Sequence, residues 1–363
     1  MPEEILFPTT IVGSYTRPSW LLGAYKTYHP RDGSPATNID QLEQLQREAK
    51  LLTIKEEEDA GLDIVSDGEQ GRTSFFEYLT EQLTGFAMSK SKPFSDGTRF
   101  LGLRKPVDKV GFRDKEPTSL KEAEFLRAHT KRKTKIAIIS PNFLLTYWEP
   151  SDYYRTRDSF LEDMITVSRE EAKSLSGKVD YVQWDDPMIS FFTEARYSSE
   201  EARELTRDAV SNMNRVLQSV SFPAGMSKAL HICWGNYKAT HQADGPLSKI
   251  YQELLDLKVD LLLIEMASAR HEDDIQVFKD YPDAKMKVAA GVVDVKTPDV
   301  EPVRLIKKRV ERMLAYVPKE NLYLTTDCGF APEWDSDRIP RSSCYQKLES
   351  MAIAAGELRR EYA

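Results

Sequence analysis

Imidazole, thiol and carboxylate side chains stand at the ends of three separate apolar runs in this 363-residue sequence. His231 and Cys233 are two residues apart, so both side chains face the same side if the run that carries them is a strand. Glu265 ends a second apolar run, and Cys328 follows a third. One imidazole, two thiolates and one carboxylate suit tetrahedral zinc, and the sulfur ligands argue against magnesium or calcium. We therefore predict a zinc site on these four residues.

The pair formed by His231 and Cys233 carries little weight by itself, because a buried histidine beside a thiol is more often a packing residue. The argument for zinc depends on the second thiol and the carboxylate at the other two run ends. Three cysteines are too few for a disulfide scaffold. The third, Cys344, begins an apolar helical pattern, and we expect it to pack in the core. His241 and His271 follow the proposed ligands closely and are interpreted either as their hydrogen-bond partners or as surface residues.

The chemistry of such a site follows from its ligands. Zinc held by two thiolates is a weak Lewis acid, because the sulfurs already donate charge to the metal. It suits binding a substrate sulfur, since a free thiol with a pKa near 8.5 is mostly protonated at pH 7 and loses its proton on coordination. The resulting thiolate is a nucleophile toward an alkyl carbon. Catalytic zinc usually keeps one open position, and we expect Glu265 to give up its place to the incoming sulfur.

Strand and helix patterns alternate about eight times along the chain, which is typical of a parallel α/β protein. Strands are expected near 8–13, 62–66, 135–140, 180–184, 226–233, 259–265, 287–293 and 321–326. Helical patterns occupy 40–60, 158–176, 199–218, 245–257, 301–316 and 341–360. Residues 261–264 are apolar without alternation, as in strands buried on both faces. We predict one (β/α)8 TIM barrel over residues 1–363, with its chemistry at the carboxyl ends of the strands. An open doubly wound sheet is the alternative.

Residues 86–120 interrupt this alternation and are rich in Lys, Arg, Pro and Gly. We predict that they form an excursion between the second and third barrel strands, such as a hairpin that reaches over one mouth of the barrel. A solvated surface loop explains the same composition equally well. The length of the chain would allow two domains, but α/β barrels reach this size as a single domain.

Composition excludes several classes of partner. The chain has 50 Lys and Arg against 58 Asp and Glu, a formal net charge of −8, so it would repel a phosphate backbone and nucleic acid is not expected. No apolar stretch approaches the roughly 18 residues that span a bilayer. Residues 1–5 are acidic and do not read as a signal peptide. We expect a cytoplasmic protein with free thiols, small-molecule partners and no membrane contact.

The motifs at the run ends resemble the catalytic barrel of the cobalamin-independent methionine synthase family. They occur in the family's order over nearly the whole chain: Thr9-Thr10-Ile11-Val12-Gly13-Ser14, Asp67-Gly68-Glu69, Asp185-Asp186-Pro187, His231-Ile232-Cys233, Ile264-Glu265, Gly291-Val292-Val293-Asp294 and Asp327-Cys328-Gly329. The resemblance implies a (β/α)8 barrel with zinc on His231, Cys233, Glu265 and Cys328. It also implies that Ser14, Glu69 and Asp185 bind the amino-acid part of homocysteine. Two carboxylates and a hydroxyl can hold an ammonium group, which agrees with that assignment.

The sequence also departs from the family pattern. Asp294 is present, but Lys296 stands where the family usually has a histidine proposed to protonate the folate leaving group. A neutral folate amine needs a proton to leave, so this change weakens the case for a folate donor. We take Asp294 and Lys296 as candidate catalytic residues. Tyr147 replaces a tryptophan that would stack on the pterin and is a candidate substrate-binding residue. Full-length plant and bacterial members carry a further amino-terminal barrel that is not found here.

Further motifs resemble the single-barrel branch that includes epoxyalkane:coenzyme M transferase, namely Cys233-Trp234-Gly235-Asn236-Tyr237 and Arg270-His271-Glu272. The leading function implied is S-methyl transfer to homocysteine, giving methionine, from a methylated folate or a methylated corrinoid protein. The alternatives are epoxide opening by coenzyme M or another small thiol, and a non-catalytic zinc- or thiol-binding relative. Coenzyme M carries a sulfonate and would prefer basic residues, so Glu69 and Asp185 favour an amino-acid thiol.

Overall fold

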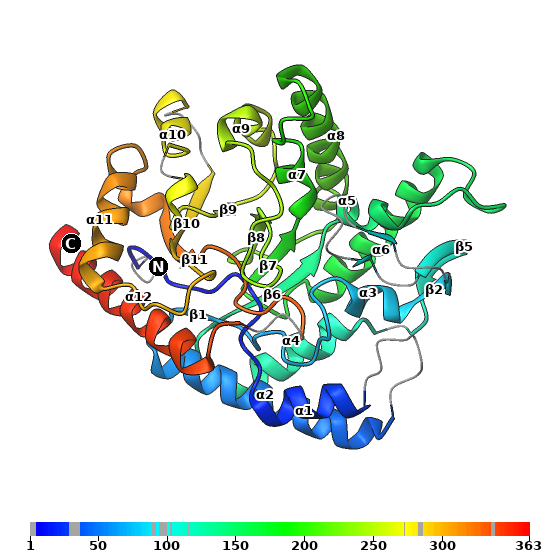
Figure 1. Cartoon of the computed structure of the whole chain (residues 1–363), viewed down its shortest axis with the longest axis horizontal. Coiled ribbons are helices and arrows are strands. Elements are labelled where there is room, and N and C mark those ends of the chain that lie inside the picture. Colours follow the sequence, from blue (N-terminus) through cyan, green and yellow to red (C-terminus); the bar gives the residue numbers. More distant parts are fainter. Residues whose placement is uncertain are drawn as a thin grey trace.

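A computed structural model describes residues 5–28, 37–88, 92–93, 100–101, 104–114, 116–271, 273–281, 286–334 and 338–363. Within them, one sheet of seven parallel strands lies inside a layer of helices (Figure 1). Its strands follow one another in chain order: β1 (Ile64–Val65), β6 (Lys133–Ile139), β7 (Tyr181–Asp185), β8 (Ser227–Ile232), β9 (Leu261–Ile264), β10 (Lys287–Val293) and β11 (Leu322–Thr326). The α/β class is as expected.

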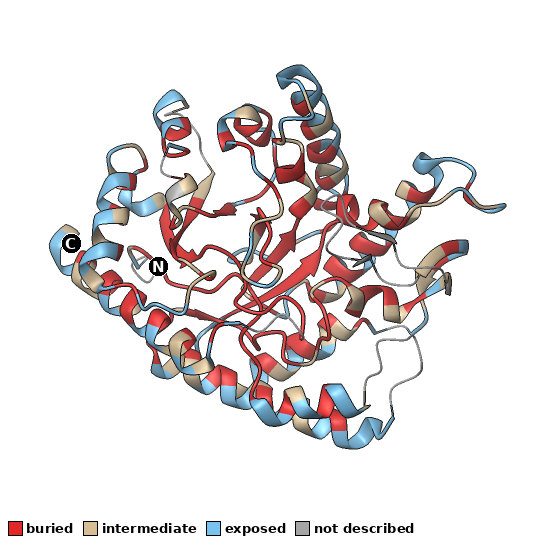
Figure 2. Cartoon of the chain, viewed as in Figure 1, coloured by how far each residue is buried: buried red, intermediate tan, exposed pale blue. Residues whose placement is uncertain are grey.

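Helices connect the successive strands, as parallel pairing requires. The longer ones are α1 (Ser19–Tyr28), α2 (Ile39–Asp59), α4 (Thr118–His129), α6 (Arg157–Leu175), α8 (Ser199–Leu217), α11 (Val303–Leu314) and α12 (Arg341–Tyr362). Short helical turns are α3 (Glu77–Gln82), α5 (Pro141–Leu144), η1 (Leu145–Tyr147), α7 (Pro187–Phe191), η2 (Leu247–Lys249), α9 (Tyr251–Leu254), η3 (Ala269–His271), α10 (Gln276–Asp280) and η4 (Lys319–Asn321). Figure 2 shows the strands buried and the outer helix faces exposed.

The run at 8–13, expected as the first strand, is reduced in the structure to a single parallel bridge between Thr9 and Leu324. The Thr10 amide donates to the Leu324 carbonyl at 3.0 Å, and the Ile64 amide donates to the Thr9 carbonyl at 3.0 Å. This segment therefore bonds to β11 on one side and to β1 on the other. A longer ladder is missing because a side chain takes its place: the Lys135 ammonium donates to the carbonyls of the next two residues, 11 and 12.

The segment at 86–120 contains paired strands in its described part. β2 (Leu83–Met88) and β5 (Arg104–Phe112) form an antiparallel pair that falls between β1 and β6 in the chain, and the short strands β3 (Lys92–Pro93) and β4 (Phe100–Leu101) also pair. The Val110 side chain is buried, and its amide donates to the Tyr154 hydroxyl at 2.8 Å. Residues 89–91, 94–99, 102–103 and 115 of the expected excursion lie outside the described residues.

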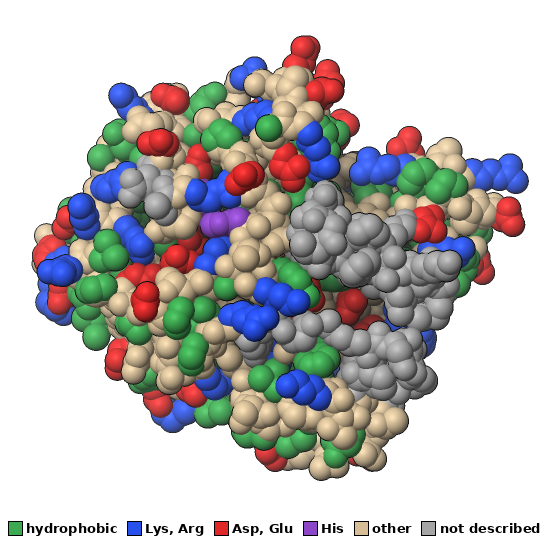
Figure 3. All heavy atoms as spheres, in the orientation of Figure 1, with side chains coloured by type: hydrophobic (Ala, Val, Ile, Leu, Met, Phe, Trp, Pro, Cys, Tyr) green, Lys and Arg blue, Asp and Glu red, His purple; other side chains and the backbone are tan. Residues whose placement is uncertain are grey.

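Two apolar layers build the core. The inner layer fills the space enclosed by the sheet with side chains that include Val12, Ile64, Tyr181 and Leu263. The outer layer lies between the sheet and the helices, where Cys344 is fully buried, so its predicted packing role is confirmed. Acidic and basic side chains are interspersed over the described part of the face in Figure 3. None of the described helices has both the length and the apolar character needed to cross a membrane.

Asp63 ties the amino-terminal segment to the last helix, and we predict that replacing it destabilises the fold. One carboxylate oxygen accepts from the Thr9 amide and from the Thr9 hydroxyl, both at 2.8 Å, and pairs with Arg359. Asp63→Ala leaves the fully buried Thr9 donors without this acceptor, so urea unfolding should show a loss of about 1–3 kcal/mol. Asp59→Ala, which breaks the exposed Lys55–Asp59 pair, should cost less than about 1 kcal/mol. Equal losses in both variants would contradict the role given to Asp63.

Candidate functional site

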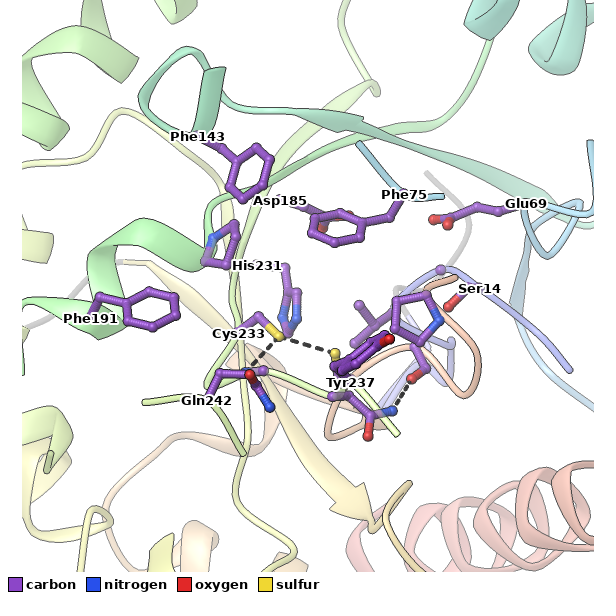
Figure 4. Close-up of a pocket in the computed structure, with 18 residues that line it drawn as sticks. Ser14, Glu69, Phe75, Phe143, Asp185, Phe191, His231, Cys233, Tyr237 and Gln242 are labelled. Carbon is purple, nitrogen blue, oxygen red and sulfur yellow. Dashed lines mark hydrogen bonds between the residues drawn. The ribbon is translucent and has the colours of Figure 1, made fainter. Parts of the chain in front are cut away.

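One pocket lies at the carboxyl ends of the strands, where parallel α/β proteins place their ligands. Its volume is about 610 Å³, with the open solvent at its mouth included. Figure 4 shows the side chains that line it. Six of the ten residues singled out in the sequence line it: Ser14, Glu69, Asp185, His231, Cys233 and Cys328. The other four, Tyr147, Glu265, Asp294 and Lys296, do not line it.

His231, Cys233 and Cys328 form a compact group whose ligand atoms all lie within 4.8 Å of one another. The two sulfurs are 3.2 Å apart. Although the His231 side chain is buried, neither of its ring nitrogens has a hydrogen-bond partner among the described residues. A buried imidazole is rarely left in that state, so a cation bound between the nitrogen and the sulfurs would satisfy it. The residues present therefore fit a soft metal such as zinc.

The two thiols of this group are not equivalent. The hydrogen bond from Cys328 lowers the pKa of the Cys233 thiol to about 5, against the effect of its burial, and the neighbouring His231 acts in the same direction. The Gly235 amide also donates to the Cys233 sulfur at 3.0 Å. Cys233 is thus prepared as a thiolate, the form that binds metals.

Glu265 follows β9 and stands outside the group of three. One of its carboxylate oxygens accepts from the Trp234 amide at 2.9 Å, and the other accepts from Lys296 and His241, both at 3.0 Å. Burial alone would raise the pKa of this carboxyl, but Lys296 and the nearby histidines hold it well below its ordinary range. The ring of His271 lies 3.6 Å from the same carboxylate oxygen. The two histidines interpreted as possible partners of the ligands therefore both contact Glu265.

His241, Glu265 and His271 also have ligand atoms within 4.8 Å of one another. The Lys296 ammonium already bonds to the carboxylate in this second group. A fixed positive charge at that point would oppose a metal cation there, so the group of His231, Cys233 and Cys328 is the better candidate.

Lys296 and Asp294 follow β10 and are not among the residues that line the pocket. The Asp294 carboxylate accepts from the Lys296 amide at 2.7 Å, and the Asp294 amide donates to the Glu301 carboxylate at 2.8 Å. Against the effect of burial, Glu265 raises the pKa of Lys296. Lys296 therefore keeps its proton at neutral pH, and its charge is directed at Glu265.

Tyr147 is buried behind the pocket wall, with its ring centroid 6.5 Å from that of Phe76 and 6.0 Å from that of Phe86. Four other aromatic residues line the pocket and were not singled out as site residues in the sequence: Phe75, Phe143, Phe191 and Tyr237. They lie in the loops that follow four predicted strands. The rule that carboxyl-end loops build the site would have found them if it had been applied to apolar residues as well.

Two glycines make room for the polar groups on the other wall. A Cβ atom on Gly13 would lie 2.3 Å from a Glu69 carboxylate oxygen, and a Cβ atom on Gly329 would lie 2.1 Å from the Ser14 hydroxyl oxygen. Glu69 itself has a left-handed backbone with φ of 55°, which is uncommon for a residue with a side chain. The loop thus accepts local strain at the residue whose carboxylate reaches the pocket.

Glu69 and Asp185 place two carboxyl groups on the same pocket. Burial raises the pKa of Glu69 to about 7; Arg72 opposes this effect, whereas Asp185 adds to it. Burial also raises the pKa of Asp185, and the nearby imidazole of His231 opposes that. Arg72 lies 4.0 Å from the Glu69 carboxylate but pairs more closely with Glu122. Two buried acids on one pocket resist ionisation together, so the pocket favours a cationic ligand group. The neighbouring Asp186 instead has a structural role, because it caps α7 by accepting from the Met188 amide.

The chain matches, over residues 7–356, a family described as the catalytic domain of cobalamin-independent synthase. Methionine synthase of Pyrococcus furiosus is 29% identical over 362 residues, which cover 99% of this chain and 95% of that protein. Methionine synthase of Sulfolobus acidocaldarius is 26% identical, with 99% and 95% covered.

Solved structures agree on the fold. A B12-independent methionine synthase from Shewanella sp. W3-18-1, in complex with selenomethionine, aligns with a TM-score of 0.79 at 24% identity and covers 98% of this chain and 99% of that one. A putative vitamin-B12 independent methionine synthase from Listeria monocytogenes aligns with a TM-score of 0.69 at 20% identity. Since the family match extends over nearly all of the sequence, this chain belongs to the cobalamin-independent methionine synthase family.

Proposed function

We propose that this protein is an S-methyltransferase that moves a methyl group from a methyl donor to homocysteine and releases methionine. The observation that carries this proposal is the meeting, in one pocket, of the His231–Cys233–Cys328 group with the carboxyl groups of Glu69 and Asp185. The first feature suits a substrate sulfur and the second suits a substrate ammonium group. Homocysteine carries both, and the relatives named methionine synthase support the same choice.

We infer that His231, Cys233 and Cys328 would hold zinc, with Glu265 as a replaceable fourth ligand. Bound zinc would lower the pKa of the incoming thiol and keep its sulfur as a nucleophile at neutral pH. Glu265 can leave the ligand set at low cost, because Lys296 and His241 already offer its carboxylate two charge-assisted hydrogen bonds. In this proposal Lys296 acts on Glu265 and Asp294 shapes the turn that presents Lys296.

Glu69, Asp185 and Ser14 would hold the amino-acid part of the substrate. The two carboxylates accept from its ammonium group, and the Ser14 hydroxyl is placed to donate to its carboxylate. Phe75, Phe143 and Phe191 provide an apolar wall that excludes water around the sulfur and the methyl carbon. The sulfur then forms a bond to the methyl carbon while the donor leaves with the electron pair of the broken bond.

Two donor classes remain in this proposal. A methylated folate agrees with the cobalamin-independent description of the family. A methylated corrinoid protein agrees with the presence of Lys296. The corrinoid leaving group needs no proton, and Lys296, whose pKa is raised by Glu265, does not readily donate one. Tyr147 packs beside Phe76 and Phe86 and does not line the pocket, so we give it a supporting role in the packing around the pocket.

We further infer that residues 8–12 close the seven-stranded sheet into the eight-membered barrel of a single domain over 1–363. Their hydrogen bonds to β11 and β1 support this closure. The β2–β5 pair would then be the excursion between the second and third strands of the barrel. We also propose a cytoplasmic location, because thiols kept as metal ligands survive in reducing surroundings.

The direct test is a matrix of thiols and alkyl donors offered to zinc-loaded protein. Homocysteine should give methionine with a methylated folate, a methylated corrinoid protein or both, whereas coenzyme M with an epoxide should give no product. Cys328→Ser should remove one thiolate ligand, so bound zinc measured by mass spectrometry and methionine formation should both fall by more than about tenfold.

The fold of Cys328→Ser should stay intact, as judged by far-ultraviolet circular dichroism, and Cys344→Ser serves as the matched control that keeps its zinc. Alkylation of homocysteine by metal-free protein would refute the mechanism. Turnover of the epoxide with coenzyme M, and none with homocysteine, would replace the proposed function by the alternative.

Binding of homocysteine should weaken as the pH falls through 7, because the raised pKa of Glu69 lies near that value. Above pH 7 the carboxylate is charged and attracts the ammonium group; below it the carboxyl is neutral. Affinity should therefore drop by up to about tenfold for each pH unit below 7, and titration calorimetry can measure it. The analogue 4-sulfanylbutanoate, which lacks the amino group, reports the pH dependence of the thiol alone. If the affinity of Glu69→Gln for homocysteine still falls more steeply with pH than its affinity for 4-sulfanylbutanoate, Glu69 is not the group that binds the ammonium.

A further inference from the structure

A fully buried lysine lies below the pocket, inside the space enclosed by the sheet. Lys135 comes from β6, and its side chain is only 1% exposed. Its ammonium donates to the Val12 carbonyl at 3.0 Å, to the Ile11 carbonyl, and to the side-chain oxygen of Gln183 at 2.6 Å. Lysine is almost never buried to this degree unless it is paired, so the group calls for an explanation beyond packing.

Gln183, on β7, connects this ammonium to the pocket. Its amide nitrogen donates to a carboxylate oxygen of Asp185 at 2.7 Å and to the Val12 carbonyl at 2.8 Å. Gln183 and Asp185 are two residues apart on one strand, so both side chains point into the enclosed space. Among the described residues, Gln183 is thus a hydrogen-bond donor to the Asp185 carboxylate.

Lys135 constrains the orientation of the Gln183 side-chain amide. An ammonium group can only donate hydrogen bonds, so the oxygen of the Gln183 amide must face Lys135 and its NH2 group must face Asp185. The Asp185 carboxylate and the Val12 carbonyl can only accept, so they favour the same orientation from the other end of the amide. With Lys135 removed, the Gln183 oxygen would lose its buried donor, and the amide would be held less firmly against Asp185.

The same cation reaches the opposite side of the substrate site. Val12 accepts from both Lys135 and Gln183, and it precedes Gly13 and Ser14, which line the pocket. Because this segment has only one bridge to the sheet, at Thr9, the two side chains supply the bonds that a strand ladder would otherwise provide. Lys135 therefore connects the Ser14 segment and Asp185 through one network of hydrogen bonds.

The charges near Lys135 are consistent with this arrangement. Burial lowers the pKa of Lys135 to about 8, but Asp185, Glu57 and Glu69 oppose the shift, so the ammonium form prevails at pH 7. Burial raises the pKa of Glu57 to about 8, which leaves that carboxyl mostly neutral. Of the two pocket carboxylates, Asp185 is connected to Lys135 through Gln183, and Glu69 lies 4.0 Å from Arg72, which bonds more closely to Glu122.

We infer that Lys135 and Gln183 are positioning residues that hold Asp185 and the Ser14 segment in register for the α-ammonium group of the thiol substrate. They thereby select amino-acid thiols over thiols that lack the amino group. This inference rests on the proposed function, in which Asp185 accepts a hydrogen bond from that ammonium group.

The test compares homocysteine with 4-sulfanylbutanoate, which has the same thiol and carboxylate but no amino group, on zinc-loaded protein. Gln183→Met keeps the side-chain volume and removes the hydrogen bond that the Asp185 carboxylate accepts from Gln183. Hydrogen bonds to a charged group are the stronger ones. The Kd of homocysteine should rise by about tenfold or more, while that of 4-sulfanylbutanoate stays within about twofold. The KM of methionine formation should rise in parallel, with kcat little changed.

Thr325→Val is the matched control, since Thr325 is buried in β11 and its hydroxyl makes no described hydrogen bond. Both ligands should bind this control as they bind the wild type. Lys135→Met should repeat the selective loss; if it does not fold, Gln183→Met decides alone. An equal loss for both ligands, or no loss for homocysteine, would overturn the inference. A wild-type protein that binds both ligands equally well would instead overturn the proposed function.

Discussion

Curvature of the parallel sheet is the constraint on which the site depends. Cys233 follows β8 and Cys328 follows β11, and two further strands lie between them. Neighbouring strands are about 4.8 Å apart, so the two strand ends would be about 14 Å apart in a flat sheet. The two sulfurs nevertheless lie 3.2 Å from each other. Only a sheet that bends around on itself brings these ends together, and the apolar layer with Tyr181 and Leu263 fills the space inside the bend.

A curved sheet that gathers polar side chains must also compensate buried charge. Several buried charged groups around the site have identified partners: Glu265 has Lys296, Asp185 has Gln183 backed by Lys135, and Arg72 has Glu122. Breaking such a pair leaves an uncompensated charge and costs several kcal/mol, so the partners are as necessary as the groups they support. His231 is the exception, since it is buried without a hydrogen-bond partner, and that is the position the proposed zinc would occupy.

Much of the site was accessible from sequence because it follows from the alternation of strand side chains. The two-residue spacing of His231 and Cys233 places both on one side of a strand, and the strand-end rule adds Cys328 and Asp185. The alternation says nothing about how a long side chain bends. Glu265 was predicted as a metal ligand, which stays a prediction, but its hydrogen bonds to Lys296 and His241, both of which come from loops, could not be predicted.

The fold shows the same limit. Apolar runs predicted seven of the strands, but the run at 8–13 keeps only one bridge, because Lys135 occupies the carbonyls of Ile11 and Val12. That contact joins residues more than a hundred positions apart, and no local pattern encodes it. Tyr147 was placed in the pocket by resemblance, but it does not line the pocket, whereas Phe75 and Phe143 do. Which aromatic ring reaches a cavity depends on the packing of several loops at once.

The central claim is that a zinc held by two protein sulfurs receives the sulfur of homocysteine as a further ligand. X-ray absorption at the zinc edge measures the number of sulfur neighbours directly, before and after homocysteine is added. The account predicts two sulfur ligands in the free protein and three with homocysteine, with the loss of one oxygen ligand as Glu265 yields its place. A first shell that does not change on adding homocysteine would contradict it.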